Sequence, residues 1–162
     1  MQPQFSIKVY KQYFNFAASH FMMFNDGSRE PLHGHNYRVS VRGDAPQLTN
    51  DMVFDFLDIK PIIRDLCNSL DHKLILPQNN EHLKIYTRNK NYHLVTKDSE
   101  FSIPMSDVLI LPINNTSAEC FCIYLATRIQ EEVSAKFKFR FKNIEVEVEE
   151  TPGQAAIYTL QD

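Results

Sequence analysis

Alternation of hydrophobic and polar residues is most regular over residues 142–149, where apolar side chains are separated by glutamates. A period of two indicates a strand with one buried and one solvent-facing side. The same pattern predicts a strand from about Asn36 to Gly43 and a last strand over 154–160. Aromatic and β-branched residues without a helical period fill residues 5–21, so we expect one long strand there, with a bulge, ending near His20.

Two segments instead have apolar residues at helical spacing. Residues 58–70 form an apolar stripe, with Asp58 as the expected cap and the end of the helix placed before Asp71. The clearest helix begins near Ala118, and Thr116 with Glu119 three residues later matches a capping box. These two helices are expected to cover the sheet.

Residues 78–104 lie between the two helices and predict an inserted hairpin, with Phe101–Ile103 as a short third strand. A short apolar strand is expected at 108–112. The element order predicts an α+β fold in which an antiparallel four-stranded sheet carries both helices on one face. With 162 residues and no internal repeat, the chain is expected to form a single domain, residues 1–162.

Composition excludes several classes of partner. Hydrophobic residues make up 43% and charged residues 23%, and the net charge of −3 gives no footprint for nucleic acid or a membrane surface. No apolar run approaches the roughly 20 residues that span a bilayer. Three cysteines do not make a disulfide framework, so we expect a cytoplasmic protein.

A metal site is suggested by His33 and His35, which flank Gly34 at the start of the 36–43 strand. Side chains two apart in a strand point to the same face, and the glycine between them lets other backbone approach closely. Two imidazoles are ligands that zinc favours, and a catalytic zinc usually takes a third, for which His20 is the nearest candidate upstream. Spacing alone is more often typical of two surface histidines on a strand than of a metal site.

Five motifs occur in order along the chain: FAASH (16–20), HGHNY (33–37), VFDF (53–56), LDHK (70–73) and ETP (150–152). Together they resemble the 6-pyruvoyltetrahydropterin synthase family, which also contains the 6-carboxytetrahydropterin synthases. The resemblance implies the tunnelling fold (T-fold), a pterin triphosphate substrate, and a homohexamer of two trimeric rings with active sites between subunits. It also implies Zn2+ held by His20, His33 and His35.

The same resemblance assigns roles to further residues. Asp71 and His72 match the family's catalytic proton-carrying pair, and Glu150 matches the carboxylate that anchors the pterin ring. Residues 115–119 resemble the family's Asn-Pro-Thr-Ala-Glu with the proline replaced, which implies that Thr116 and Ser117 bind the pterin, cap the helix, or do both. From the residues alone, an Asp-His pair just past a helix end is also consistent with a simple cap or ion pair.

One position departs from the synthases of both named branches, which carry a cysteine shortly before the His-Gly-His. Residues 26–32 contain none, and Glu30 stands three residues before His33, as in the family's glutamate-type (class III) branch. That likeness implies a lyase that converts 7,8-dihydroneopterin triphosphate to 6-hydroxymethyl-7,8-dihydropterin for folate biosynthesis, with Glu30 as base.

Other interpretations stay open. The product could be 6-pyruvoyltetrahydropterin, for tetrahydrobiopterin biosynthesis, or the 6-carboxy product. The chain could also be an inactive pterin-binding homologue, with Glu30 only a solvated loop carboxylate. Which basic residues hold the triphosphate, and what residues 78–104 do, cannot be assigned from the sequence.

Overall fold

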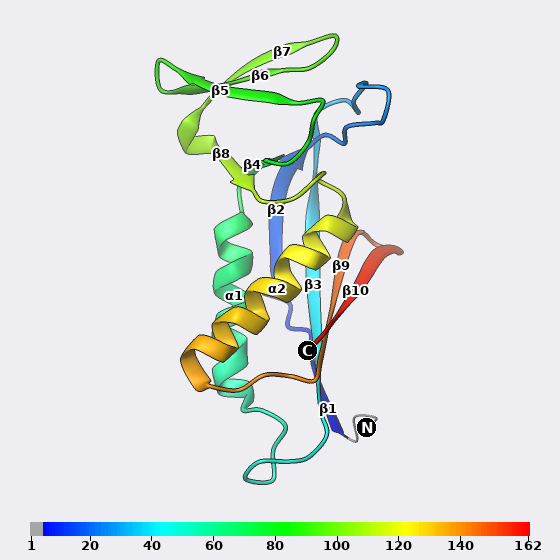
Figure 1. Cartoon of the computed structure of the whole chain (residues 1–162), viewed down its shortest axis with the longest axis vertical. Helices are drawn as coiled ribbons and strands as arrows, with labels where there is room; N and C mark the ends of the chain where they lie inside the picture. Colours follow the sequence, from blue (N-terminus) through cyan, green and yellow to red (C-terminus); the bar gives the residue numbers. More distant parts are fainter. Residues whose placement is uncertain (1–4) are drawn as a thin grey trace.

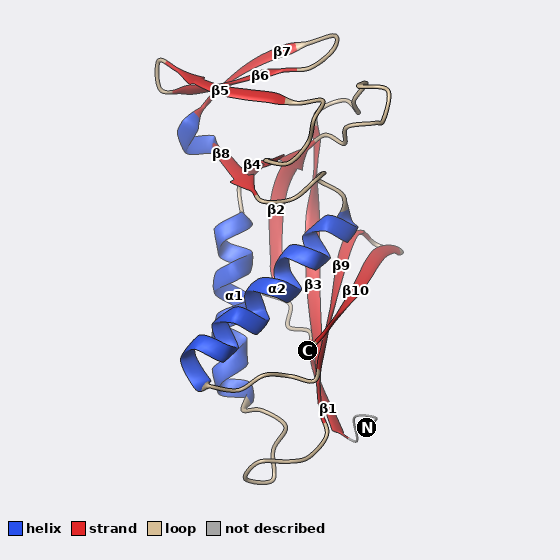
Figure 2. Cartoon of the chain, in the orientation of Figure 1, coloured by secondary structure: helices blue, strands red, loops and turns tan. Residues whose placement is uncertain are grey.

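A large curved sheet with two helices on one face forms the body of the molecule, in a computed structural model that describes residues 5–162 (Figures 1 and 2). Within these residues the helices are α1 (Phe56–Leu70) and α2 (Ala118–Phe137). The body sheet has seven strands: β1 (Phe5–Val9), β2 (Asn15–His20), β3 (His33–Ala45), β4 (Lys73–Pro77), β8 (Val108–Leu111), β9 (Asn143–Thr151) and β10 (Gln154–Gln161).

The strand order is β10-β9-β3-β2-β4-β8, with β1 also paired to β3. The predicted α+β class and T-fold are confirmed, but the four-stranded antiparallel sheet is a correction, since β4 and β8 extend it through parallel pairings. Both are short apolar runs without a period-two pattern. Such runs do not show from local sequence that they join a sheet as parallel strands.

The first predicted strand is also divided. β1 pairs with the far half of β3, where Val9 faces Val41, and β2 pairs with its near half, where Asn15 faces Arg38. Between them the chain turns outward, and the Phe14 amide donates to the Lys11 carbonyl at 3.0 Å. The expected bulge is therefore a turn between two strands aligned along the same partner.

Apolar side chains of β2, β3 and β9 meet those of both helices in one core. Phe16 stacks on Tyr37 with ring centroids 4.8 Å apart, and Phe121 of α2 packs edge-on against both rings. β3 begins at His33, three residues earlier than predicted, because its pairing with β2 continues to the His33–His20 pair. This extension carries both histidines into the sheet.

The helix caps differ from the predicted ones by one to three residues. Asp55, not Asp58, caps α1, and its carboxylate accepts from the Leu57 amide at 2.8 Å. Ser117, not Thr116, caps α2 and accepts from the Cys120 amide at 3.1 Å. The end of α1 before Asp71 is confirmed. Neither helix of the described residues is long and apolar enough to cross a membrane.

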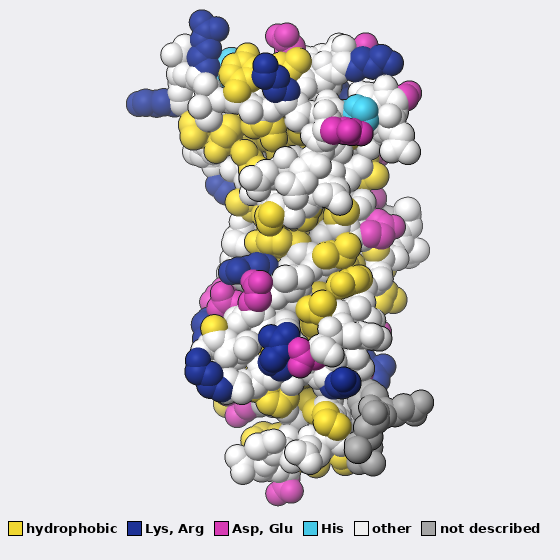
Figure 3. Space-filling view, viewed as in Figure 1, with side chains coloured by type: hydrophobic (Ala, Val, Ile, Leu, Met, Phe, Trp, Pro, Cys, Tyr) yellow, Lys and Arg dark blue, Asp and Glu magenta, His cyan; other side chains and the backbone are white. Residues whose placement is uncertain are grey.

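The inserted segment forms a separate three-stranded sheet at one end of the molecule (Figure 1). Its strands are β5 (Lys84–Arg88), β6 (Asn91–Val95) and β7 (Glu100–Pro104), and the 3-10 helix η1 (Met105–Asp107) leads back to β8. A second, smaller core lies beneath it and includes Phe21 and Leu94. Hydrophobic side chains also gather on the surface under this sheet (Figure 3). The predicted hairpin with a third strand is confirmed.

Candidate active site

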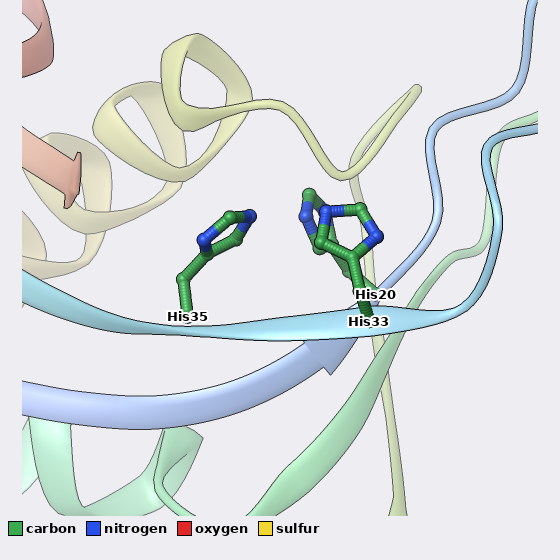
Figure 4. Close-up of side chains that lie close together, drawn as sticks. All are labelled: His20, His33 and His35. Carbon is green, nitrogen blue, oxygen red and sulfur yellow. The ribbon is translucent and has the colours of Figure 1, made fainter.

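Three histidines meet on the face of the sheet that carries the helices. β2 and β3 are antiparallel, with His20 opposite His33 and Ala18 opposite His35, so the alternation of side chains brings all three imidazoles to one side. One nitrogen of each lies within 4.8 Å of the others. Figure 4 shows the rings on one side of the strands, facing the loop that leads into α2. The predicted cluster can hold a metal ion.

The hydrogen bonds of these rings fit such a role. Nδ1 of His20 lies 2.8 Å from the Thr116 carbonyl and Nδ1 of His33 lies 2.7 Å from the Pro31 carbonyl. A carbonyl only accepts, so each Nδ1 carries the proton and each Nε2 keeps a free lone pair. Within the described residues, the buried Nε2 atoms of His20 and His35 have no hydrogen-bond partner. Burial also lowers the pKa of His20, which favours the neutral form that binds metal.

Gly34 keeps the two ligand strands close together. A Cβ atom at this position would lie 2.9 Å from the carbonyl oxygen of Ala18 on β2, nearer than real Cβ contacts allow. The obstacle is backbone, which cannot rotate away. The close approach that the glycine predicted is therefore made by the strand that carries His20.

A cavity of about 490 Å³ opens beside the histidines, within the size range of small-molecule sites. It is lined by His20, Glu30, Ser117 and Glu150, so four predicted site residues from three separate parts of the chain meet there. Oε1 of Glu30 accepts from the Met22 amide at 2.9 Å, which orients the carboxylate. Oε1 of Glu150 lies 3.5 Å from Nε2 of His35. The cavity thus combines carboxylates with the edge of the histidine cluster.

Thr116 does not line this cavity. Its side chain is fully buried and its hydroxyl donates to the Phe21 carbonyl at 3.0 Å, while its own carbonyl holds His20. The residue therefore supports a candidate ligand instead of presenting its hydroxyl to the cavity. The neighbouring Ser117 is both the cap of α2 and a cavity residue.

Asp71 and His72 lie elsewhere, where α1 passes into β4. The two Asp71 oxygens are each 2.8 Å from a partner, the Ala17 amide and Nδ1 of His72. These interactions, the Ala17 bond first, lower the pKa of Asp71. The His72 amide donates to the Ala17 carbonyl at 2.7 Å, its φ is 57°, and its side chain is 82% exposed. A non-glycine residue in this conformation is held by its surroundings.

His72 borders a second cavity, of about 590 Å³, together with Ala17, Ser19, Gly34 and Asn36. Strand alternation places these four residues on the sheet face opposite the histidine cluster. Within one chain, the Asp71–His72 pair and Glu30 therefore do not share a cavity.

A family model described as 6-pyruvoyl tetrahydropterin synthase matches residues 8–161. This chain belongs to that family. A Methanocaldococcus jannaschii protein named "Putative 6-carboxy-5,6,7,8-tetrahydropterin synthase" is 37% identical over 144 residues, which cover 88% of each chain.

Solved structures of two Plasmodium proteins agree. The 6-pyruvoyl tetrahydropterin synthase of Plasmodium falciparum has a TM-score of 0.91 and 34% identity, over 99% of this chain and 100% of that one. That of Plasmodium vivax, solved as a glutamate-to-alanine mutant of a catalytic residue, has a TM-score of 0.90 and 34% identity, over 98% of each chain. As a member of the 6-pyruvoyl tetrahydropterin synthase family, the protein has a pterin-synthase-like function.

The cavity also contains residues that the sequence motifs did not single out. Glu119 at the start of α2, Met22, and residues 153–156 at the β9–β10 turn all line it. Glu119 was interpreted only as the partner in a capping box. Its position three residues after Thr116 gave no sign that the start of this helix forms part of the lining of this cavity.

Proposed function

We propose that the protein is a zinc-dependent lyase that cleaves the side chain of 7,8-dihydroneopterin triphosphate and releases 6-hydroxymethyl-7,8-dihydropterin, with Glu30 as the base. The observation that carries this proposal is the position of Glu30, whose carboxylate lines one cavity with His20 and Glu150. The Plasmodium vivax relative, with its catalytic glutamate, supports the same assignment.

The cysteines support a carboxylate base as well. None of the three lines the cavity. Cys67 and Cys122 are buried in the core, and burial raises the pKa of each thiol to about 12, which keeps both protonated at neutral pH. Cys120 is only half-buried on α2 and also lies outside the cavity.

Three neutral imidazoles form a ligand set that a catalytic zinc uses, and zinc bound there would supply a Lewis acid that lowers the pKa of a substrate hydroxyl. Glu30 takes the proton of the hydroxyl on the second side-chain carbon. That carbon becomes a carbonyl as its bond to the first carbon breaks, and the released electron pair passes into the conjugated pterin ring. A proton returns to the first carbon. No oxidant or reductant is needed.

Glu150 is proposed to anchor the pterin ring. Its two carboxylate oxygens match the adjacent N–H donors on the edge of the ring, an arrangement in which a charged acceptor strengthens both hydrogen bonds. Ser117 at the start of α2 also lines this cavity and adds a hydroxyl. This holds the side chain of the substrate toward Glu30 and the histidines.

Asp71 and His72 are proposed to serve the cavity of a neighbouring copy in a homohexamer built as a dimer of trimers. The pair is prearranged by its bonds to Ala17, and the imidazole projects from the chain. Imidazole is the side chain best suited to take and then give back the proton that the cleavage moves. An intersubunit site explains why the pair is ordered without sharing a cavity with Glu30.

A second candidate product follows from the Methanocaldococcus jannaschii relative, whose name specifies the 6-carboxy compound.

Product analysis by mass spectrometry distinguishes the 6-hydroxymethyl product from the 6-carboxy product after incubation of the zinc-loaded protein with 7,8-dihydroneopterin triphosphate. We expect 6-hydroxymethyl-7,8-dihydropterin from the unmodified protein, and only a small residual rate of its formation from Glu30→Ala. A 6-carboxy or 6-pyruvoyl product from the unmodified chain would overturn the proposal, and Glu30→Cys tests whether a thiol redirects the product.

A further inference from the structure

Arg29 connects the segment that carries Glu30 to the inserted sheet. Its Nε donates to the Ser99 hydroxyl and its Nη1 donates to the Glu30 carbonyl, both at 2.8 Å. The guanidinium carbon lies 4.7 Å from the ring centre of Phe101 and 5.5 Å from that of Phe21. One side chain therefore bridges the insertion and the residue proposed as the base.

Ser99, the residue of the insertion to which Arg29 bonds, is itself fixed by hydrogen bonds to Thr96. The Ser99 hydroxyl is 2.7 Å from that of Thr96, which is buried, and the Thr96 amide donates to the Ser99 carbonyl at 2.9 Å. Phe101 on β7 stacks on Phe21, at the end of β2, with ring planes 12° apart. The turn between β6 and β7 thus provides a fixed acceptor and an aromatic surface for the guanidinium.

The position of Glu30 depends on this segment. Residues 22–30 fold back on themselves, since the Glu30 amide donates to the Met22 carbonyl while the Glu30 carboxylate accepts from the Met22 amide, both at 2.9 Å. The Asn115 side chain bonds to the backbone of Met23 on one flank. On the side of the insertion, the same segment is restrained by the hydrogen bonds of Arg29 to Ser99 and to the Glu30 carbonyl.

We propose that Arg29 is a positioning residue for Glu30, and that the inserted sheet supports the reaction by fixing Arg29 through Ser99 and Phe101. The inference rests on the proposed function, in which Glu30 is the base. A flat guanidinium can donate in two directions while stacking on rings, which an ammonium cannot do.

The experiment combines hydrogen exchange with kinetics in Arg29→Met, Arg29→Lys and Ser99→Ala, with Arg88→Met as the control. Arg88 is an exposed arginine of β5 in the same insertion. We expect faster amide exchange within residues 22–30 in Arg29→Met, and a kcat lower by about tenfold to 100-fold, the effect of a base displaced by about 1 Å. KM and zinc content should change little. Arg29→Lys should recover only part of the loss, and Ser99→Ala should show a smaller change in the same direction.

A double mutant separates positioning from direct action. In a chain that already carries Glu30→Ala, Arg29→Met should cause no further loss of kcat, because the group that it positions is gone. An additional loss there, or unchanged exchange in residues 22–30, would overturn the inference. The exchange measurement needs no substrate. If Glu30→Ala were fully active the proposed function would fail, while the exchange data would still decide whether Arg29 holds the segment.

Discussion

The Asp71 carboxylate accepts a hydrogen bond from the backbone amide of Ala17, 54 residues earlier in the chain, at 2.8 Å. The bond fixes the start of β4 against the middle of β2, and the second carboxylate oxygen holds Nδ1 of His72. A carboxylate on Nδ1 leaves Nε2 as the outward nitrogen of the imidazole. The pair thus has the arrangement that the proposed proton carrier needs, with a largely exposed imidazole.

Subunit complementation tests whether His72 serves another copy. Glu30→Ala and His72→Ala should each reduce turnover to a small residual rate, whereas the proposed hexamer assembled from both chains should regain about a quarter of the normal activity. Random assembly then gives some interfaces that keep both intact residues. The measurement is kcat per mixed hexamer after co-expression with two different tags. Absence of any recovery would place both groups in one chain's site.

The lowered pKa of Asp71 makes its contribution to stability depend on pH. A carboxyl whose folded pKa lies below its unfolded value stabilises the protein above the unfolded pKa, and this contribution disappears as pH falls through the folded pKa. Asp71→Asn should therefore lower the free energy of unfolding by a constant amount from about pH 7 to about pH 5. The difference in free energy of unfolding between the variant and the unmodified protein should disappear below about pH 4. Asp65→Asn, at an exposed position of α1, is the control for denaturant unfolding. A gap that persists in acid would contradict the assignment.

Metal content tests the histidine cluster without any substrate. Because one of three ligands is lost, His35→Ala should reduce bound zinc from about one ion per chain to near zero after dialysis. His82→Ala removes a histidine of the inserted segment that lies outside the cluster, and it should retain the ion. Elemental mass spectrometry gives both stoichiometries. Equal zinc content in the two variants would rule out the cluster as the binding site.

Glu150 is expected to determine affinity for the pterin ring. Glu150→Gln keeps the shape but replaces two charged acceptors with one neutral acceptor and a donor, so the dissociation constant for neopterin should rise about tenfold to 100-fold. Glu147→Gln is the matched control, since Glu147 lies on the same strand as Glu150, opposite Ser40 of β3, and does not line the cavity. Fluorescence titration measures both. Similar affinities for both variants would place the ring elsewhere.

Local patterns in the sequence were enough to predict the parts of the site that depend on a single strand. The alternation around His33 and His35 places both on one face whatever the rest of the chain does, and the helical spacing of α1 places Asp71 at its end. The pairing of β2 with β3 that adds His20 is a long-range property. His20 was a candidate only because it is the nearest histidine upstream, and the resemblance to a family then implied it as the third ligand.

The remaining features depend on contacts between distant segments. Whether Thr116 or Ser117 caps α2 is decided by the Phe21 carbonyl, which lies 95 residues earlier in the chain. It accepts the hydrogen bond of the Thr116 hydroxyl, and this leaves the cap to Ser117. The role of Arg29 depends on Ser99, 70 residues later, in an insertion with a pattern that predicts only a hairpin. Neither Phe21 nor Ser99 can be identified as a partner from the residues that surround Thr116 or Arg29.

The close contact at Gly34 also bears on how mutational data for this protein would be interpreted. Any side chain there must push β2 away from β3, which separates His20 from His33 and His35 without altering a ligand. In a saturation screen scored by the proposed zinc-dependent activity, Gly34 would therefore be as intolerant as the histidines beside it. A list of intolerant positions would then suggest four metal ligands where only three are proposed.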